Sequence, residues 1–280
     1  MKLLRYGPAG QEKPGLMHTD GTVRDLSGVV ADIDGTAVTP EGLAKIAAAD
    51  AGSLPVVDNP GRIGPCVGHI GKCLCIGLNY SDHAAETGAE PPTEPIVFHK
   101  ALTAICGPND NVEKPRGSEA LDWEVELAII IGSRAKYVSE ADAMNHVAGF
   151  AVFNDVSERN YQIHRLGTWT KGKSHDTFGP LGPWLVTKDE VADVHNLPMW
   201  LDVNGEKRQR GNTNTLIFNV PKIISYVSNF MTLEPGDVIP TGTPPGVAMG
   251  MKPPQYLNVG DTMALGIEGL GEQKQTVVAA

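Results

Sequence analysis

Acidic residues alternate along one segment of the 280-residue chain, and their spacing suggests a site for a hard cation. Asp122, Glu124 and Glu126 occur within residues 121–131, where the alternation and the β-branched end predict a β-strand. Residues two apart on a strand share a face and lie about 7 Å apart. Carboxylates withdrawn from water repel one another unless a cation joins them, and Mg²⁺, Mn²⁺ and Ca²⁺ prefer oxygen ligands. A solvated acidic edge explains this spacing equally well.

A second source of carboxylate favours the metal site. Residues 149–155 form an apolar run that ends at Asp155, and the polar residues 156–160 follow it. This pattern predicts a strand with Asp155 at its end, where ligands commonly bind. The isoleucines at 129–131 indicate that the first strand is covered on both faces. We therefore expect carboxylates from two neighbouring strands to meet in a crevice.

Two other motifs match phosphate chemistry, but their surroundings argue against it. Residues 32–36 fit the strand-end signature of haloacid dehalogenase phosphatases, with Asp32 as the nucleophile, yet the apolar run before them is short. We expect an Asp-Gly turn there instead. Residues 167–174 fit a P-loop, but a polar segment precedes them and the glycine- and proline-rich residues 175–183 cannot form the required helix.

The elements that position these residues belong to a strand-dominated α+β protein with two predicted domains. Residues 1–68 form a small β-rich N-terminal domain, with a hairpin turn at Asp20 and a helix that begins after Thr39. Residues 69–280 form a second domain. It contains a hairpin at Asn204 and an amphipathic helix, whose apolar face carries Val220, Ile223, Ile224, Val227 and Met231.

Composition restricts the classes of partner. The net charge of −10 argues against general nucleic-acid binding, which requires a basic face. No apolar run approaches the ~20 residues of a membrane span, and residues 1–6 do not resemble a signal peptide. We therefore expect a cytoplasmic protein without membrane or nucleic-acid partners. The four cysteines are too few for a disulfide framework in a chain of this length, and we expect buried thiols.

Several motifs, taken together, resemble the fumarylacetoacetate hydrolase family. In the family's order, they are residues 75–86, 98–100, 122–127, 154–162, 171–174 and 235–247. The resemblance implies a mixed β-sandwich roll that carries one Mg²⁺ or Mn²⁺, usually in a homodimer. It also implies that the metal ligands are Glu124, Glu126 and Asp155.

The same resemblance implies further roles. The catalytic pair of histidine and glutamate falls on His83 and Glu86, and the active-site lysine falls on Lys173. The predicted substrate-binding residues are Gln162, Thr243, Arg159 and Tyr80. Leu78 stands where relatives that decarboxylate short diacids often have arginine, which argues against that activity here.

The implied reaction is hydrolysis of the C3–C4 bond of a 2,4-diketo acid, with a small 2-oxo acid as the partner molecule. Its products are pyruvate and a carboxylic acid. The substrate is an acylpyruvate or a 2,4-diketo-3-deoxy sugar acid, and we favour sugar acids such as the rhamnonate or fuconate. Alternatives within the fold are a ureidoglycolate lyase, an oxaloacetate decarboxylase and a dienedioate isomerase. More distant alternatives are a phosphatase that uses Asp32 and a relative that binds ligands without catalysis.

Overall fold

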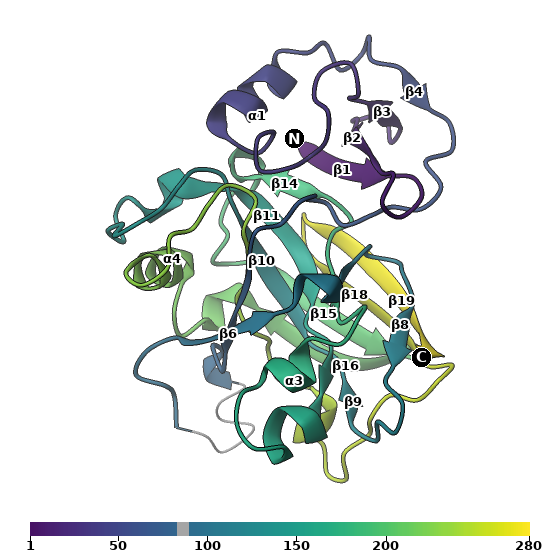
Figure 1. Ribbon diagram of the computed structural model, residues 1–280, viewed down its shortest axis with the longest axis vertical. Helices are drawn as coiled ribbons and strands as arrows, with labels where there is room; N and C mark the ends of the chain where they lie inside the picture. Colours follow the sequence, from purple (N-terminus) through teal and green to yellow (C-terminus); the bar gives the residue numbers. More distant parts are fainter. Residues whose placement is uncertain (83–89) are drawn as a thin grey trace.

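The computed structural model describes residues 1–82 and 90–280, and strands dominate it (Figure 1). Its largest sheet has ten strands. In spatial order they are β4 (Val56–Val57), β3 (Val23–Asp25), β2 (Lys13–Met17), β1 (Lys2–Tyr6), β14 (Leu185–Thr187), β11 (Val147–Asn154), β10 (Val125–Ile131), β17 (Val238–Pro240), β5 (Cys73–Gly77) and β6 (Ile96–Lys100). β17 and β5 pair in parallel, whereas β10 is antiparallel to both of its neighbours, β11 and β17. The strand-dominated α+β fold expected from the sequence is confirmed.

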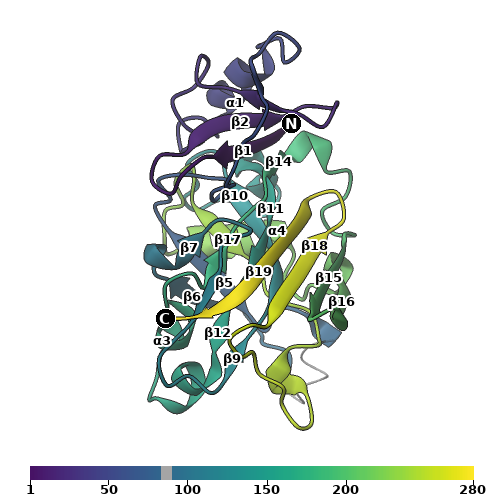
Figure 2. The same ribbon diagram turned by 90° about the vertical axis from the view of Figure 1, so that its right-hand side faces the viewer.

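A second, five-stranded sheet lies beside β10 and β11 (Figure 2). In spatial order it contains β16 (Glu206–Asn212), β15 (Pro198–Val203), β18 (Thr262–Ile267), β19 (Gly271–Ala279) and β8 (Val112–Lys114). Two short pairs complete the strands, namely β9 (Leu121–Asp122) with β12 (Ser157–Glu158) and β7 (Ile105–Cys106) with β13 (Gly179–Pro180).

Helices are short. The α-helices of the described residues are α1 (Pro40–Ala47), α3 (Thr170–Lys173) and α4 (Val220–Ser228), and a π-helical turn covers Asn160–His164. Single 3₁₀ turns cover Leu102–Ala104, Ala143–His146, Lys188–Glu190, Thr213–Thr215 and Ala248–Gly250. Within residues 1–82 and 90–280, none of the helices has the length and apolar character needed to cross a bilayer.

Strand β10 is the centre of the fold because both of its faces are buried. Leu127 and Ile129 pack with Leu265 in the core that lies against the second sheet. Ala128 and Ile130 point to the opposite face and pack in a second core, beneath the N-terminal residues. The expectation that this strand is covered on both faces is confirmed. A strand buried on both sides gives the carboxylates at its start a rigid support.

The N-terminal residues extend the large sheet. Strand β1 pairs with β14, with Leu3 opposite Leu185, and α1 packs over this end of the molecule (Figure 1). Asp32 accepts hydrogen bonds from Arg5 Nε at 2.7 Å and from Arg5 Nη2 at 3.0 Å. The residue of the phosphatase-like motif thus belongs to an ion pair of the N-terminal unit.

Local sequence signals correspond to the observed turns and caps. Thr39 Oγ1 accepts a hydrogen bond from Gly42 N and caps α1, while Asn219 caps α4 in the same way. Hairpins turn between β2 and β3 and between β15 and β16, as predicted. In the second hairpin, Asn204 and Gly205 have φ of 52° and 78°, the left-handed values that this tight turn requires. All four cysteines are free and buried, which confirms the expectation of thiols.

Candidate active site

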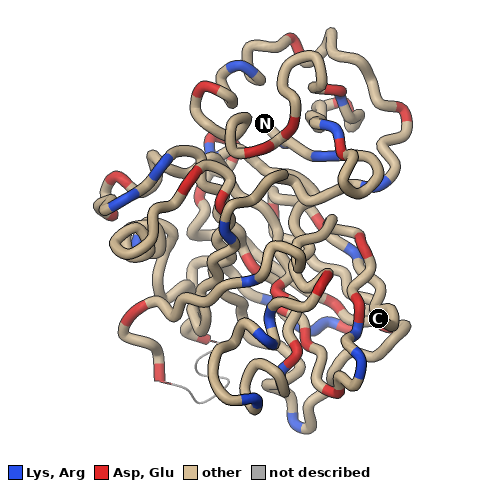
Figure 3. Tube along the Cα trace, viewed as in Figure 1, with Lys and Arg blue, Asp and Glu red and all other residues tan. Residues whose placement is uncertain are grey.

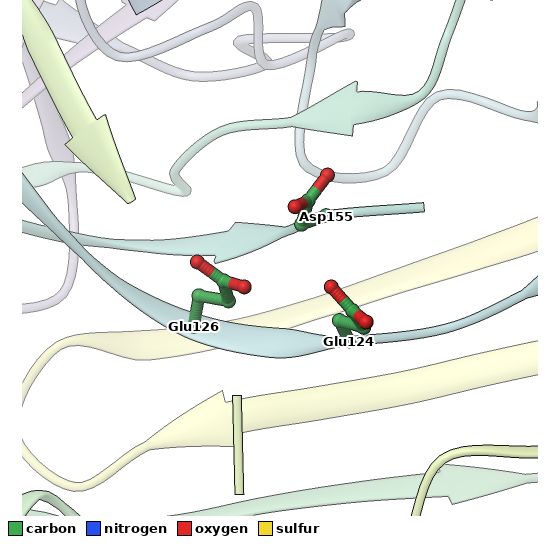
Figure 4. A group of neighbouring side chains, drawn as sticks. All are labelled: Glu124, Glu126 and Asp155. Carbon is green, nitrogen blue, oxygen red and sulfur yellow. The ribbon is translucent and has the colours of Figure 1, made fainter. Parts of the chain in front are cut away.

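Three buried carboxylates converge at the ends of two adjacent central strands of the large sheet (Figure 4). Glu124 immediately precedes β10, Glu126 lies on it, and Asp155 follows β11. The two strands are antiparallel, so β10 begins where β11 ends, and Asp155 N donates to Glu124 O at 2.9 Å. One oxygen atom from each of the three carboxylates lies within 4.8 Å of the other two. This triad has the donor atoms and the spacing that a hard divalent cation requires.

Asp122 does not join the triad, although the sequence predicted one uninterrupted strand. The strand is interrupted at Trp123 and Glu124, so that β9 and β10 pair with different partners. Asp122 Oδ2 accepts a hydrogen bond from Arg159 Nε at 2.8 Å, and Oδ1 accepts one from Ala248 N at 2.8 Å. The prediction of one uninterrupted strand was therefore wrong, and Asp122 anchors a loop while it shares the Arg159 guanidinium with Glu124.

Lys173 neutralises two members of the triad. Its Nζ atom lies 2.6 Å from Glu124 Oε2 and 2.8 Å from Asp155 Oδ2, and the side chain is 2% exposed. The short helix α3 supplies this lysine from the segment that matched the P-loop pattern. The segment that matched the P-loop pattern therefore places the ammonium group of Lys173 against the carboxylates. In Figure 3, basic and acidic segments alternate in the region around α3 and β9.

Two further basic side chains, Arg159 and Lys100, contact the triad. Arg159 Nη2 donates to Glu124 Oε1 at 2.6 Å, and Nη1 donates to Gln162 Oε1 at 2.9 Å. Lys100, at the end of β6, forms a buried ion pair with Asp155 and donates to the carbonyl oxygen of Val156 at 3.0 Å. Lys100 was not among the residues predicted to form the site. The signal that could have found it is a lysine at the end of an apolar strand within a recognised motif.

The surroundings shift the pKa values of the two glutamates of the triad in opposite directions. Burial opposes the ionisation of Glu124, but Arg159 and Lys173 outweigh it and lower the pKa of this carboxyl to about 2. Burial raises the pKa of Glu126 well above 4.5, and the charges of Asp155 and Glu124 raise it further. Within the described residues, Glu126 forms no ion pair, and its Oε2 accepts a hydrogen bond from Gly242 N at 2.8 Å. Of the two glutamates, Glu126 is therefore the one whose ionised form a bound cation would stabilise more.

A cavity of about 230 Å³ opens onto this cluster. Its polar and charged lining consists of Glu124, Glu126, Arg159, Gln162, Lys173 and Thr243. Its other lining residues are Ile76, Gly77, Leu78, Phe98, Ile163, Trp169, Gly242 and Met249. Three of the four predicted substrate-binding residues line this cavity together with Glu124 and Glu126, namely Arg159, Gln162 and Thr243.

Tyr80 is the exception among the predicted substrate-binding residues. Its side chain is fully buried, and its hydroxyl group donates to Met199 Sδ at 3.1 Å. Tyr80 does not line the cavity, because the chain after β5 turns its ring into the hydrophobic core. The catalytic pair predicted at His83 and Glu86 lies outside the described residues, and its role stays a prediction.

Comparison with known proteins identifies the family and the fold. The family model described as fumarylacetoacetate (FAA) hydrolase C-terminal matches residues 72–278. The chain belongs to this family. The resemblance inferred from the motifs is thereby confirmed, together with the roll-type fold that it implied. A protein of Burkholderia lata, which carries a provisional name as a hydrolase, is 57% identical over 276 residues, or 98% of each chain.

Two solved structures show the range of reactions among similar fumarylacetoacetate hydrolase-family proteins. A maleylpyruvate hydrolase from Sphingobium sp. SYK-6, in complex with manganese(II) and pyruvate, is 29% identical, with a TM-score of 0.82 over the whole of both chains. A 5-carboxymethyl-2-hydroxymuconate delta-isomerase from Mycobacterium smegmatis is 31% identical, with a TM-score of 0.76 over 100% of this chain and 99% of the other. The family assignment therefore supports an enzyme of hydrolase or isomerase type.

Proposed function

We propose that this protein is a hydrolase that depends on Mg²⁺ or Mn²⁺ and cleaves the C3–C4 bond of a 2,4-diketo acid. The products are pyruvate and a carboxylic acid. The observation that carries the proposal is the triad of Glu124, Glu126 and Asp155, which lies buried at the base of a cavity with Lys173 and Arg159. Similarity to a maleylpyruvate hydrolase in complex with manganese(II) and pyruvate supports it.

The residues of the triad fit a divalent cation. Three carboxylate oxygens within 4.8 Å of one another form a hard, anionic ligand set, and Glu126 lacks a cation of its own among the described residues. Glu124, Glu126 and Asp155 hold the cation in this proposal. When bound, it supplies Lewis-acid polarisation of the substrate's carboxylate and 2-keto oxygens.

The side chains of this chain perform the remaining tasks. His83, oriented by Glu86 three residues later in the sequence, removes a proton from water, and the resulting hydroxide attacks the C4 carbonyl carbon. The C3–C4 bond then breaks, and its electron pair forms the enolate of pyruvate. Lys173 keeps its charge, because its pKa is raised by Asp155 and Glu124 despite burial, and it stabilises the developing enolate. His83 returns the proton to C3, so that atoms and charge balance.

Release of pyruvate tests this function. The purified protein, supplied with Mg²⁺ or Mn²⁺, is incubated with acylpyruvates and with 2,4-diketo-3-deoxy sugar acids, and pyruvate is measured with lactate dehydrogenase. Release of CO₂ from oxaloacetate or of urea from ureidoglycolate tests the decarboxylase and lyase alternatives in parallel. Pyruvate release that depends on the metal supports the proposal, and its absence from all these diketo acids contradicts it.

An isomerase is the second candidate, because the chain is 31% identical to a delta-isomerase over nearly the full length of both proteins. An isomerase moves a double bond within the substrate and releases no fragment. The ultraviolet spectrum of a dienedioate substrate therefore separates the two reactions. A spectral change without pyruvate favours the isomerase.

The assembly and the partners are also proposals. We propose a homodimer that acts on a small 2-oxo acid, without nucleic-acid or membrane partners. Light scattering coupled to size-exclusion chromatography tests the dimer. A mass close to that of one 29.8 kDa chain would contradict it.

A further inference from the structure

We propose that the acyl group of the substrate is apolar and uncharged, so that the preferred substrates are alkyl or aryl acylpyruvates. Dicarboxylates and sugar acids are poorer substrates. This inference rests on the proposed function and specifies the part of the substrate farthest from the triad. It departs from the sugar acid that the sequence favoured.

The cavity lining has a charged part and an apolar part, the apolar wall. The carboxylates and basic side chains contact one another in ion pairs, and the two parts meet where Lys173 Nζ lies 5.2 Å from the centre of the Phe98 ring. The apolar side chains come from β5 and the residues after it, from β6, from the segment before α3 and from the turn at Ala248–Gly250. They are Ile76, Leu78, Phe98, Ile163, Trp169 and Met249. An apolar group placed against this wall loses water at no electrostatic cost.

Leu78 is fixed in the apolar wall by its neighbours. Its φ of 50° lies in the left-handed region, which a leucine adopts only when the surrounding structure imposes it. The next residue, Asn79, is fully buried, and its side chain donates to Phe218 O at 3.0 Å and to Thr241 O at 2.8 Å. It also accepts a hydrogen bond from Phe218 N at 2.7 Å. These three bonds hold the turn that presents Leu78 to the cavity.

Trp169 is equally well fixed. A Cβ atom on Gly77 would lie 2.3 Å from the Trp169 ring, so the indole packs directly on the backbone at the end of β5. The same ring contacts Phe98 edge-on, with 5.3 Å between the ring centroids. The apolar wall therefore exists before the substrate binds, and little conformational entropy is lost when it is covered.

The described lining of the cavity offers no free counter-ion for a second carboxylate. Among its described lining residues the basic side chains are Arg159 and Lys173, and carboxylates of the protein already engage both. The sequence of residues 83–89 contains neither lysine nor arginine, and its histidine, His83, has to be neutral to act as the proposed base. A substrate carboxylate placed against the apolar wall would therefore lose its hydration without gaining a partner.

Hydroxyl groups of a sugar acid also lack partners there. The neutral polar side chains of the described lining are Gln162 and Thr243. Thr243 Oγ1 already donates to Val125 O at 2.9 Å and accepts from Gln209 Nε2 at 2.8 Å. Gln162 Oε1 already accepts a hydrogen bond from Arg159. Apart from the Gln162 amide nitrogen, the neutral side chains of the described lining therefore have their hydrogen-bonding groups engaged, and most hydroxyl groups of a sugar acid would lie against carbon atoms.

A matched pair of substrates tests the inference. 7-Methyl-2,4-dioxooctanoate and 2,4-dioxoheptanedioate have the same shape, but the first ends in an isopropyl group and the second in a carboxylate. We expect kcat/KM for pyruvate release to be at least about tenfold higher for the first. We also expect kcat/KM to rise about fourfold with each methylene added to the acyl chain until the cavity is full. Equal or higher kcat/KM for the dicarboxylate, or for a sugar acid, would overturn the inference.

Substitution of Leu78 places a counter-ion in the apolar wall. Leu78→Arg is expected to lower kcat/KM for the methyl-branched substrate and to raise it for the dicarboxylate, so that the ratio changes by tenfold or more. Leu102→Arg is the matched control, because Leu102 is 44% exposed and does not line the cavity. The control should keep the wild-type ratio. A ratio that is the same in the Leu78 variant, the control and the wild type would contradict the assignment.

Binding provides a readout that is independent of turnover and of the folding of any variant. N-Alkyl oxamates carry the same chelating head with tails of different chemistry, and calorimetry measures their affinity for the wild-type protein in Mg²⁺. Affinity should rise about fourfold per methylene and fall when the tail ends in a carboxylate. If diketo acids are not cleaved but oxamates follow this order, the proposed function fails and the apolar site stands. If affinity is independent of the tail, or if no oxamate binds, the inference fails.

Discussion

Lys173 Nζ lies 2.6 Å from Glu124 Oε2, although the two residues are separated by 49 positions in the chain. The short helix that carries Lys173 and the strand that follows Glu124 therefore meet at the site through a buried ion pair. Because the same ammonium group contacts Asp155, it occupies the space between two of the three proposed metal ligands. A bound divalent cation has to share this space with Lys173 or displace the ammonium group.

The variant Lys173→Met tests this relationship. Glu124 and Asp155 share the ammonium group of Lys173, and the methionine removes this positive charge from both buried carboxylates. We therefore expect the metal-free protein to lose about 3–5 kcal/mol of unfolding free energy. A divalent cation should restore part of that loss, so Mg²⁺ should raise the variant's stability by more than it raises that of the wild type. Urea denaturation with and without Mg²⁺ measures both effects.

Lys171→Met is the control for that experiment. Lys171 is exposed, lies two residues before Lys173, and donates to the backbone carbonyl groups of Arg165 and Leu166. We expect its replacement to change stability by less than about 1 kcal/mol. Similar losses in the two variants would mean that Lys173 does not neutralise the triad.

Replacement of Glu126 by glutamine should remove most of the activity while the protein folds normally. The glutamine amide oxygen can still accept the hydrogen bond from Gly242 N, so the local backbone keeps its partner. The lost negative charge weakens cation binding, and the expected fall in kcat is about 100-fold or more. Circular dichroism and the pyruvate assay measure the two outcomes. Turnover close to that of the wild type would refute the assignment of Glu126 as a ligand.

Affinity for the metal should depend on pH through Glu126. Because its pKa in the folded protein lies well above 4.5, its contribution to the stability of the metal-free form is complete at low pH and is lost as pH rises through the folded pKa. The ligand form is the carboxylate, so cation binding displaces the proton and the affinity increases with pH over that same range. Calorimetry in two buffers of different ionisation enthalpy detects the released proton.

The variant Glu126→Gln provides the control for this proton release, because an amide cannot titrate. Its residual cation affinity should show a shallower pH dependence than that of the wild type. A wild type that releases no proton at any pH would mean that Glu126 is already ionised in the metal-free protein.

Asp32→Asn separates the proposed hydrolase from the phosphatase alternative. Asp32 receives two hydrogen bonds from Arg5, so loss of its charge should lower the unfolding free energy by about 1–3 kcal/mol. The proposed hydrolase activity should change by less than about twofold. Loss of all catalytic activity in a folded Asp32→Asn protein would instead support a nucleophilic role for this aspartate.

The fold could be predicted where a local signal determines local structure. The cap at Thr39 and the turn at Asn204 depend on neighbouring residues, and each formed where the local sequence predicted it. The interruption of the predicted strand at Trp123 could not be predicted. It depends on the Trp123 indole donating to Gly246 O and on Asp122 binding Arg159, contacts with residues distant in the chain.

The candidate site was predictable to the same extent. Glu124 and Glu126 are spaced by the strand period, and Asp155 follows an apolar run, so their convergence required only that the two strands be neighbours. The burial of Tyr80 depends on how the residues after β5 pack against Met199, which no local pattern encodes, and the contact of Lys100 with Asp155 depends on the pairing of distant segments, although its place at the end of an apolar strand was a local signal. Contacts between residues that are distant in the chain could not be predicted from the sequence alone.

A crystal structure of the protein soaked in MnCl₂, with data collected at the manganese absorption edge, tests the proposed metal site most directly. If the triad holds the cation, one anomalous peak lies in direct contact with carboxylate oxygens of Glu124, Glu126 and Asp155. A fully soaked crystal in which Glu124 and Asp155 keep their contacts with Lys173, with no anomalous density among the three carboxylates, would contradict the metal site.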